Sequence, residues 1–326
     1  MDNGGFVNEE HEVDEIVEFR RGWERDYAND YGSFEDITVP PMRYAFTPAP
    51  KYTICENALQ IFSVKVAKLK DEDIGWPLHV YGLIATRDSV DPRRNLLFHR
   101  TRDDCQILTQ EHPFLQLTGP SRAIVLIDLV KFEVQLKAKG RTESEDKILN
   151  FNVFPYNHFV SVERPPSITT LHSDRSRSEL EFTLAPLVQT VEATILVHVV
   201  RGSWADHLRG QVVSHTASID HGDILLLDSR DGRMRILSSA IQLSRRVISV
   251  ELRGELKIDV VASQIGDGKF VAAKCLVFTP KKASMSQDMC DLGFCKLRIT
   301  VGWSLVPTLA SERANGISRT VIGLFG

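Results

Sequence analysis

The sequence predicts an all-β protein built from two tandem antiparallel β-sandwich units that arose by internal duplication. Short apolar runs alternate with polar residues, and Pro and Gly interrupt these runs about every ten residues. Motifs of the first half also recur in the same order in the second half. A length of 326 residues exceeds one ordinary core and favours two domains.

The first 56 residues form an acidic leader. Residues 1–36 contain twelve Asp/Glu and three Arg, although the whole chain has a net charge of only −4. Val13, Ile16, Val17 and Phe19 fall on one side of a helix over residues 12–25, which Gly22 weakens. We expect residues 1–56 to be mostly disordered or to form this one short helix. Alternatively, the leader screens a mildly basic body until a partner displaces it.

The duplicated unit is recognised by matched motifs. The pairs are Gly82 to Ala85 with Gly210 to Val213, Ser121-Arg122 with Ser244-Arg245, and Val134 and Leu136 with Ile258 and Val260. We place the two repeats at residues 57–188 and 189–306, followed by a tail at residues 307–326. Each repeat has about eight candidate strands, and a C2-like sandwich of the calcium- and lipid-binding type is the nearest shape. Because almost no linker separates the repeats, they should pack as one rigid body.

Composition narrows the compartment and the partners. The sequence pI is about 6.2, so charge does not favour nucleic acid as a partner. The five cysteines form no Cys-x-x-Cys pair; Cys290 and Cys295 could pair only in an oxidising compartment. No secretory signal and no run long enough to cross a membrane is visible. We expect a cytoplasmic or nuclear protein.

Calcium is the first ligand that the fold class suggests, because the ion needs several carboxylates gathered on loops. The candidate carboxylates are scattered: Asp71, Asp73, Glu143, Glu145 and Asp146 in the first repeat, and Asp206 and Asp267 in the second. No regular spacing recurs. We expect solvated loop acids, and therefore no metal ion and no other cofactor.

The densest cluster of charge spans residues 87–104. It contains Arg87, Asp88, Asp91, Arg93, Arg94, Arg100 and Arg102. Because acids nearly cancel bases, a nucleic-acid stripe is not indicated. The favoured interpretation is a solvated hairpin stabilised by short-range ion pairs. The alternative is a polar docking surface for a protein partner, formed by these seven residues.

Catalytic signatures are not apparent. The sequence has no Gly-x-Ser-x-Gly elbow and no Gly-rich phosphate loop. His79, His198 and His215 fall in predicted strands, where a lone histidine is more often structural. Trp76 and Trp204 occupy equivalent loops and are expected to plug the sandwich ends. We therefore name no catalytic residue.

Several strings together resemble a plant domain family of unknown function that is expanded in grasses. They include Trp76 to Gly82, Leu117 to Val125, Leu226 to Gly232 and Cys290 to Gly293. Some proteins of that family are labelled jasmonate-induced or rRNA N-glycosylase-like, which implies a defence or stress setting. The resemblance leaves a non-enzymatic interaction or regulatory module as the leading hypothesis. A ribosome-inactivating rRNA N-glycosylase and a calcium-dependent membrane-docking module are the alternatives. Glu192-Ala193 lacks the Arg that the glycosylase motif requires.

Overall fold

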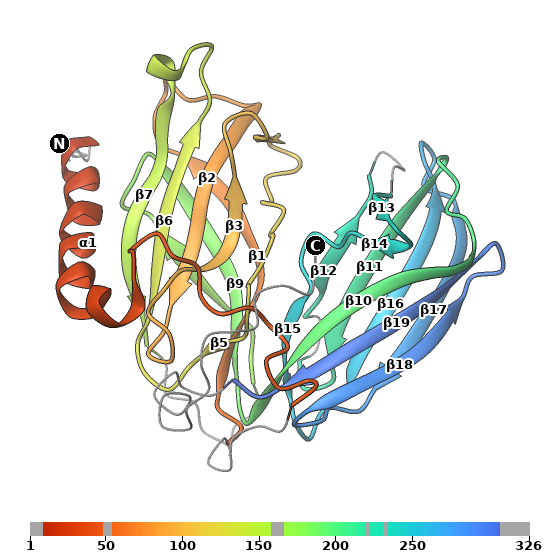
Figure 1. The fold of residues 1–326 in the computed structure, drawn as a ribbon. Helices are drawn as coiled ribbons and strands as arrows, with labels where there is room; N and C mark the ends of the chain where they lie inside the picture. The colour runs from red at the N-terminus through yellow and green to blue at the C-terminus, as the bar shows by residue number, and fades with distance from the viewer. Residues whose placement is uncertain (1–8, 48–53, 158–165, 220–221, 231–233, 307–326) are drawn as a thin grey trace.

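The computed structural model describes residues 9–47, 54–157, 166–219, 222–230 and 234–306. It confirms the all-β fold: two antiparallel sandwiches stand beside each other, and one long helix lies against the outer side of the first (Figure 1). The proposed tail at residues 307–326 lies outside the described residues.

Strands β1 to β9 form the first sandwich. Its β1 sheet has the order β5-β1-β9-β8, and its β2 sheet has the order β3-β2-β6-β7 with β4 paired to β2. The bounds are β1 (Ala58–Leu69), β2 (Leu78–Arg87), β3 (Asn95–Arg100), β4 (Gln106–Leu108), β5 (Ile124–Val125), β6 (Val130–Ala138), η1 (Glu143–Glu145, a 3-10 helix), β7 (Lys147–Tyr156), β8 (Thr169–Ser173) and β9 (Ser178–Leu187).

Strands β10 to β19 form the second sandwich. Its β10 sheet has the order β13-β14-β10-β19-β18 with β15 paired to β10, and its β11 sheet has the order β12-β11-β16-β17. The bounds are β10 (Thr190–Gly202), β11 (Leu208–Thr216), β12 (Ile224–Asp228), β13 (Ile236–Leu237), β14 (Ala240–Ile241), β15 (Val247–Glu251), β16 (Leu256–Gln264), β17 (Phe270–Phe278), β18 (Ser284–Asp291) and β19 (Cys295–Ser304).

The two sandwiches repeat one topology. β1 pairs with β5 and β9 as β10 pairs with β15 and β19, and β2 pairs with β3 and β6 as β11 pairs with β12 and β16. Even the β-bulge recurs, after Ile84 in β2 and after Val212 in β11. An accidental likeness would not reproduce a bulge at the same place in the ladder.

One part of the sequence match is shifted by two residues. Gly82 pairs with Leu136, whereas the equivalent Gly210 pairs with Ala262 and not with Val260. Alternation has a period of two, so the shifted match kept every side chain on its correct face. The corrected register makes Arg87 and Glu133 equivalent to His215 and Asp259.

Each sandwich has its own apolar core, and the two are joined without a flexible linker. Phe62 of β1 packs into the core of the second sandwich. The Arg245 guanidinium donates to the carbonyl oxygens of Ile61 (2.7 Å) and Phe62 (3.2 Å). Gln116 donates to the Ser244 hydroxyl at 2.7 Å. These contacts fix one sandwich against the other.

The leader is more ordered than the sequence predicts. Helix α1 runs over Glu9–Tyr31, well beyond residues 12–25, and packs beside β7. Trp23 and Phe34 are almost completely buried, and the Trp23 indole donates to the carbonyl oxygen of Pro92 at 2.7 Å. Charge in the leader does not prevent docking, because its aromatic side chains supply the contact surface.

No helix in the described ranges has the length and apolar character that crossing a membrane requires. The five cysteines are free thiols. Cys290 and Cys295 are both buried in the β18–β19 hairpin, where Cys290 is opposite Leu297.

Candidate functional site

The first half of the predicted polar cluster is buried beneath the leader. Arg87 and Arg94 both bind the Glu133 carboxylate, at 2.8 and 2.5 Å, and all three side chains are largely shielded from solvent. Arg87 also donates to the carbonyl oxygen of Phe34 at 2.8 Å. Its guanidinium lies 4.1 Å from the centre of the Phe34 ring and 5.3 Å from that of Trp23. Arg87, fixed by Glu133, therefore holds the leader on the β2 sheet.

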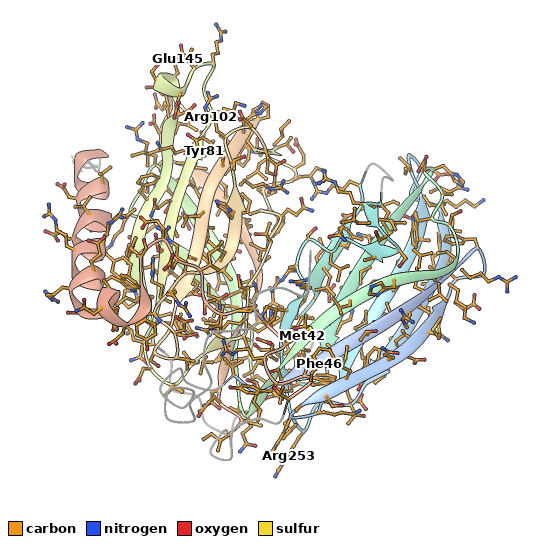
Figure 2. All side chains as sticks on the ribbon, viewed as in Figure 1. Met42, Phe46, Tyr81, Arg102, Glu145 and Arg253 are labelled. Carbon is orange, nitrogen blue, oxygen red and sulfur yellow. The ribbon has the colours of Figure 1, made fainter. Side chains whose placement is uncertain are left out.

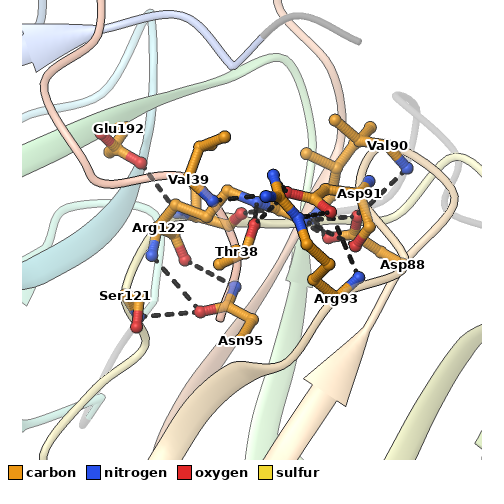
Figure 3. Close-up of polar contacts among 12 residues, drawn as sticks. Thr38, Val39, Asp88, Val90, Asp91, Arg93, Asn95, Ser121, Arg122 and Glu192 are labelled. Atoms are coloured by element: carbon orange, nitrogen blue, oxygen red, sulfur yellow. Dashed lines mark hydrogen bonds and ion pairs between the residues drawn. The ribbon is translucent and has the colours of Figure 1, made fainter. Parts of the chain in front are cut away.

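The second half of the cluster surrounds Arg122. Asp88 binds the Arg122 guanidinium through both carboxylate oxygens, at 2.7 and 2.8 Å (Figure 3). Thr38 of the leader accepts from Arg122 and donates to Asp91 at 2.6 Å. Burial lowers the pKa of Arg122, but the Asp88 carboxylate outweighs this effect, and the pKa is raised overall. This network joins the leader to the loops at one end of the first sandwich.

Asp91 is buried but stays ionised. Burial alone would raise its pKa, yet hydrogen bonds from Arg93 and Thr38 bring the pKa down to about 2. Arg93 binds Asp91 at 2.8 Å and keeps only a small part of its own surface exposed. The carboxylate is thus a fixed negative charge at neutral pH.

Glu192 links the leader, the first sandwich and the second sandwich. It lies in β10, is almost completely buried, and accepts the backbone N–H groups of Met42 and Ala123, each at 2.9 Å. Burial raises its pKa, while the two N–H groups partly oppose that shift. Two cavities beside it are each about 10 Å³, room for roughly one water molecule. The Glu192-Ala193 pair is therefore a structural joint.

The two remaining arginines of the cluster lie elsewhere. Arg100 pairs with Asp104 at 2.7 Å, and Arg102 pairs with Asp146 at 2.8 Å. Tyr81 also donates to Asp146, and Figure 2 shows Tyr81 and Arg102 at the end of the first sandwich near η1. The seven predicted residues therefore do not form one exposed surface. Arg87, Asp88, Asp91 and Arg94 are buried, and a docking surface could include only Arg93, Arg100 and Arg102.

Several carboxylates considered for calcium already have cationic partners. Asp71 pairs with Arg177 at 2.9 Å, and Asp146 pairs with Arg102. Within the described ranges, no group of three or more His, Cys, Asp or Glu side chains is placed to hold a metal ion.

An exposed surface that the sequence did not single out lies on the second sandwich. It is the outer face of the β11 sheet, here called the β11 face. Strand register places on it the side chains of Gln211, Val213, His215, Leu225, Lys257, Asp259, Val261, Ala273, Cys275 and Val277. Val277 is 52% exposed and Leu225 is 40% exposed.

The β11 face corresponds to the face of the β2 sheet that the leader covers. His215 and Asp259 occupy the positions of Arg87 and Glu133, and the His215 Nε2 lies 2.9 Å from an Asp259 carboxylate oxygen. The two side chains are 31% and 33% exposed, whereas those of Arg87 and Glu133 are 3% and 0% exposed. In Figure 1, α1 lies against the first sandwich and no described helix accompanies the second.

The fold and these sites define a double β-sandwich protein with a docked N-terminal helix. The chain belongs to the family described as Domain of unknown function (DUF6598), whose pattern matches residues 58–301. Among curated proteins, none matches the chain.

The solved structures that match the chain are distant from it. One contains the two tandem C2 domains of extended synaptotagmin 2, with 9% identity and a TM-score of 0.26, covering 83% of this chain and 99% of that chain. Another is "Human GIVD cytosolic phospholipase A2", with 10% identity and a TM-score of 0.22, covering 78% of this chain and 31% of that chain.

Proposed function

We propose that the chain is a non-enzymatic protein-interaction module that binds a protein partner through the β11 face. The observation that carries this proposal is the contrast between two equivalent faces of one duplicated fold. The face on the first sandwich is covered by α1, whereas the β11 face exposes apolar side chains. Exposed apolar side chains bordered by polar residues are typical of an interaction surface.

The energetics favour a modest but specific contact. Covering Val277 and Leu225, each about half exposed, would stabilise a complex by about 1 kcal/mol apiece. The joint at Arg245 and Phe62 keeps the two sandwiches in a fixed arrangement, so little order must be gained on binding. The sequence resemblance supports a plant stress or defence setting, and the cysteine pattern supports a location in the cytoplasm or nucleus.

Photo-crosslinking tests the proposal. A benzophenone amino acid replaces Val277 in the full chain, or Leu237 as a control that is exposed on the other sheet. In an extract of the source tissue, we expect a discrete adduct from position 277 only. Unlabelled wild-type chain should compete for it, and the Val277→Asp chain should not. Equal adducts from both positions, or catalytic turnover by the isolated chain, would overturn the proposal.

A further inference from the structure

We propose that the partner of the β11 face is an extended, acidic segment that adds a strand to the free edge of β17. This inference rests on the proposed function and deepens it by naming the conformation and the charge of the partner. Strand β17 is the last strand of the β11 sheet, and among the described strands it pairs with β16 alone. Figure 1 shows it on the side of the second sandwich that faces away from the first.

The equivalent edge of the first sandwich is closed by side chains. Strand β7 is the counterpart of β17 and is the last strand of the β2 sheet. The Ser178 hydroxyl donates to the Leu149 carbonyl oxygen at 2.9 Å, and the Phe151 N–H donates to the Ser176 hydroxyl at 3.3 Å. These serines satisfy backbone groups of β7 that another strand would otherwise need, so this edge is not open to strand addition.

Strand β17 has the same edge without these closing contacts. The same β-bulge interrupts both ladders, and the strand register makes Val271 the counterpart of Leu149. Two residues further on, Ala273 is the counterpart of Phe151. Within the described residues, no side chain and no strand other than β16 pairs with the Val271 carbonyl oxygen or the Ala273 N–H. The backbone of β17 is therefore available to a further strand.

The difference follows from substitutions in the neighbouring hairpin. Strand register places Cys295 where the first sandwich has Ser178. The turn before it has Gly293 at the position of Ser176. A thiol is a weak hydrogen-bond donor, and glycine has no side chain to contribute. Phe270, at the start of β17, is meanwhile 66% exposed, so the open edge also carries apolar surface that a further strand would cover.

Positive charge predominates along this edge. Residues 265–291 contain three aspartates and four lysines, namely Lys269, Lys274, Lys281 and Lys282. Asp291 lies 3.5 Å from Lys296, so two aspartates remain against four lysines that form no ion pair within the described residues. On the neighbouring strand β16, the charges of Lys257 and Asp259 cancel. An acidic segment would therefore meet a net attraction at this edge, and a basic segment would meet a net repulsion.

Lys274 also argues against a second copy of the chain as the partner. It is the central residue of β17, and its side chain is exposed. An antiparallel pairing of two β17 strands over their full length would oppose two Lys274 ammonium groups, which is destabilising. Lysine on an edge strand is a common protection against such self-pairing. A partner strand with Asp or Glu opposite Lys274 would turn the same charge into a favourable cross-strand pair.

The test uses the full chain and a fluorescent eight-residue peptide of alternating valine and glutamate. We expect saturable binding that slows hydrogen exchange of the Ala273 amide, measured by NMR, because the added strand would accept its N–H. A control peptide of the same sequence, methylated at its backbone nitrogens, cannot donate to β17. It should bind at least about tenfold more weakly.

Charge reversal tests the acidic character of the partner. Lys274→Glu should weaken binding of the valine–glutamate peptide by about fivefold and should allow a valine–lysine peptide to bind. Lys68→Glu, at an exposed lysine of β1 in the first sandwich, is the matched control and should change neither affinity. Both positions are exposed, so neither substitution disturbs a core.

The inference is overturned if the valine–glutamate peptide does not bind, binds without slowing exchange at Ala273, or binds no better than its methylated form. It is also overturned if Lys274→Glu leaves the affinity for both peptides unchanged. If the competed adduct at position 277 still forms in those cases, the interaction function stands and only the added strand is rejected. If neither peptide binding nor the adduct is seen, both proposals fail.

Discussion

The two sandwiches place equivalent pairs of polar side chains in opposite surroundings. In the first, Arg87 and Glu133 are shielded from water by the leader, and a second arginine, Arg94, shares the carboxylate. In the second, His215 and Asp259 remain about one-third exposed. The same strand positions thus hold a structural clamp in one copy and an accessible surface in the other.

The duplicated Ser-Arg motif diverges in a similar way. Arg122 and Arg245 both precede the short strand that pairs with the first strand of their sandwich, and both are fully buried. Asp88 neutralises Arg122, but Thr216 follows His215 where Asp88 follows Arg87. Arg245 has carbonyl partners instead, and burial lowers its pKa to about 10.

The largest difference is expected between Glu133→Gln and Asp259→Asn. Glu133→Gln leaves Arg87 and Arg94 buried without a counter-charge and should lower the free energy of unfolding by about 4–5 kcal/mol. Asp259→Asn affects a solvent-screened pair and should cost less than about 1 kcal/mol. Urea titrations measure both values, and equal losses would contradict the assigned difference in burial.

A second contrast separates the two arginines. Arg122→Met leaves Asp88 without its cation and should cost about 3–4 kcal/mol. Arg245→Met removes a buried charge that has no carboxylate and should cost about 1 kcal/mol, for the two carbonyl groups that lose a donor. Thermal and urea unfolding of the two variants provide the comparison. A larger loss for Arg245→Met than for Arg122→Met would contradict the smaller stabilisation assigned to the Arg245 contact between the sandwiches.

Acid should weaken the first sandwich through Asp91. Its pKa in the folded chain is about 2, below its ordinary value of 3.8, so the stabilisation is present above about pH 4 and lost as the pH falls toward 2. The loss should be about 2 kcal/mol, and Asp91→Asn should show a correspondingly flatter profile. Unfolding free energies measured between pH 5 and pH 2 test this, and parallel curves for the two chains would refute it.

The sequence predicted the strands better than the sites. Alternation located β6, but it could not show that Glu133, on the solvent side of that strand, is buried beneath the leader. The charges over residues 87–104 suggested a solvated hairpin because they nearly cancel locally. Two of their decisive partners, Glu133 and Arg122, lie more than thirty residues further along the chain.

The same limit explains the leader and the β11 face. Composition predicted a mostly disordered leader, because the aromatic contacts of Trp23 and Phe34 depend on a surface formed elsewhere in the chain. The sequence pattern predicts only a structural histidine in a strand at position 215. Only the register of β11 with β16 shows that it occupies the position of Arg87.

The central claim is that the leader covers one face of the β2 sheet, whereas the equivalent β11 face is exposed. Thiol labelling tests this claim most directly. Cys275 is opposite Asp259 in the second sandwich, and Val153 is opposite Glu133 at the equivalent place in the first. A thiol introduced by Val153→Cys is therefore the matched probe beneath the leader. It is placed in a chain that also carries Cys55→Ser, Cys105→Ser and Cys275→Ser. We predict that Cys275 reacts roughly tenfold faster than the thiol at position 153, and that Trp23→Ala accelerates only the latter. Equal rates in the wild-type leader background would contradict the account.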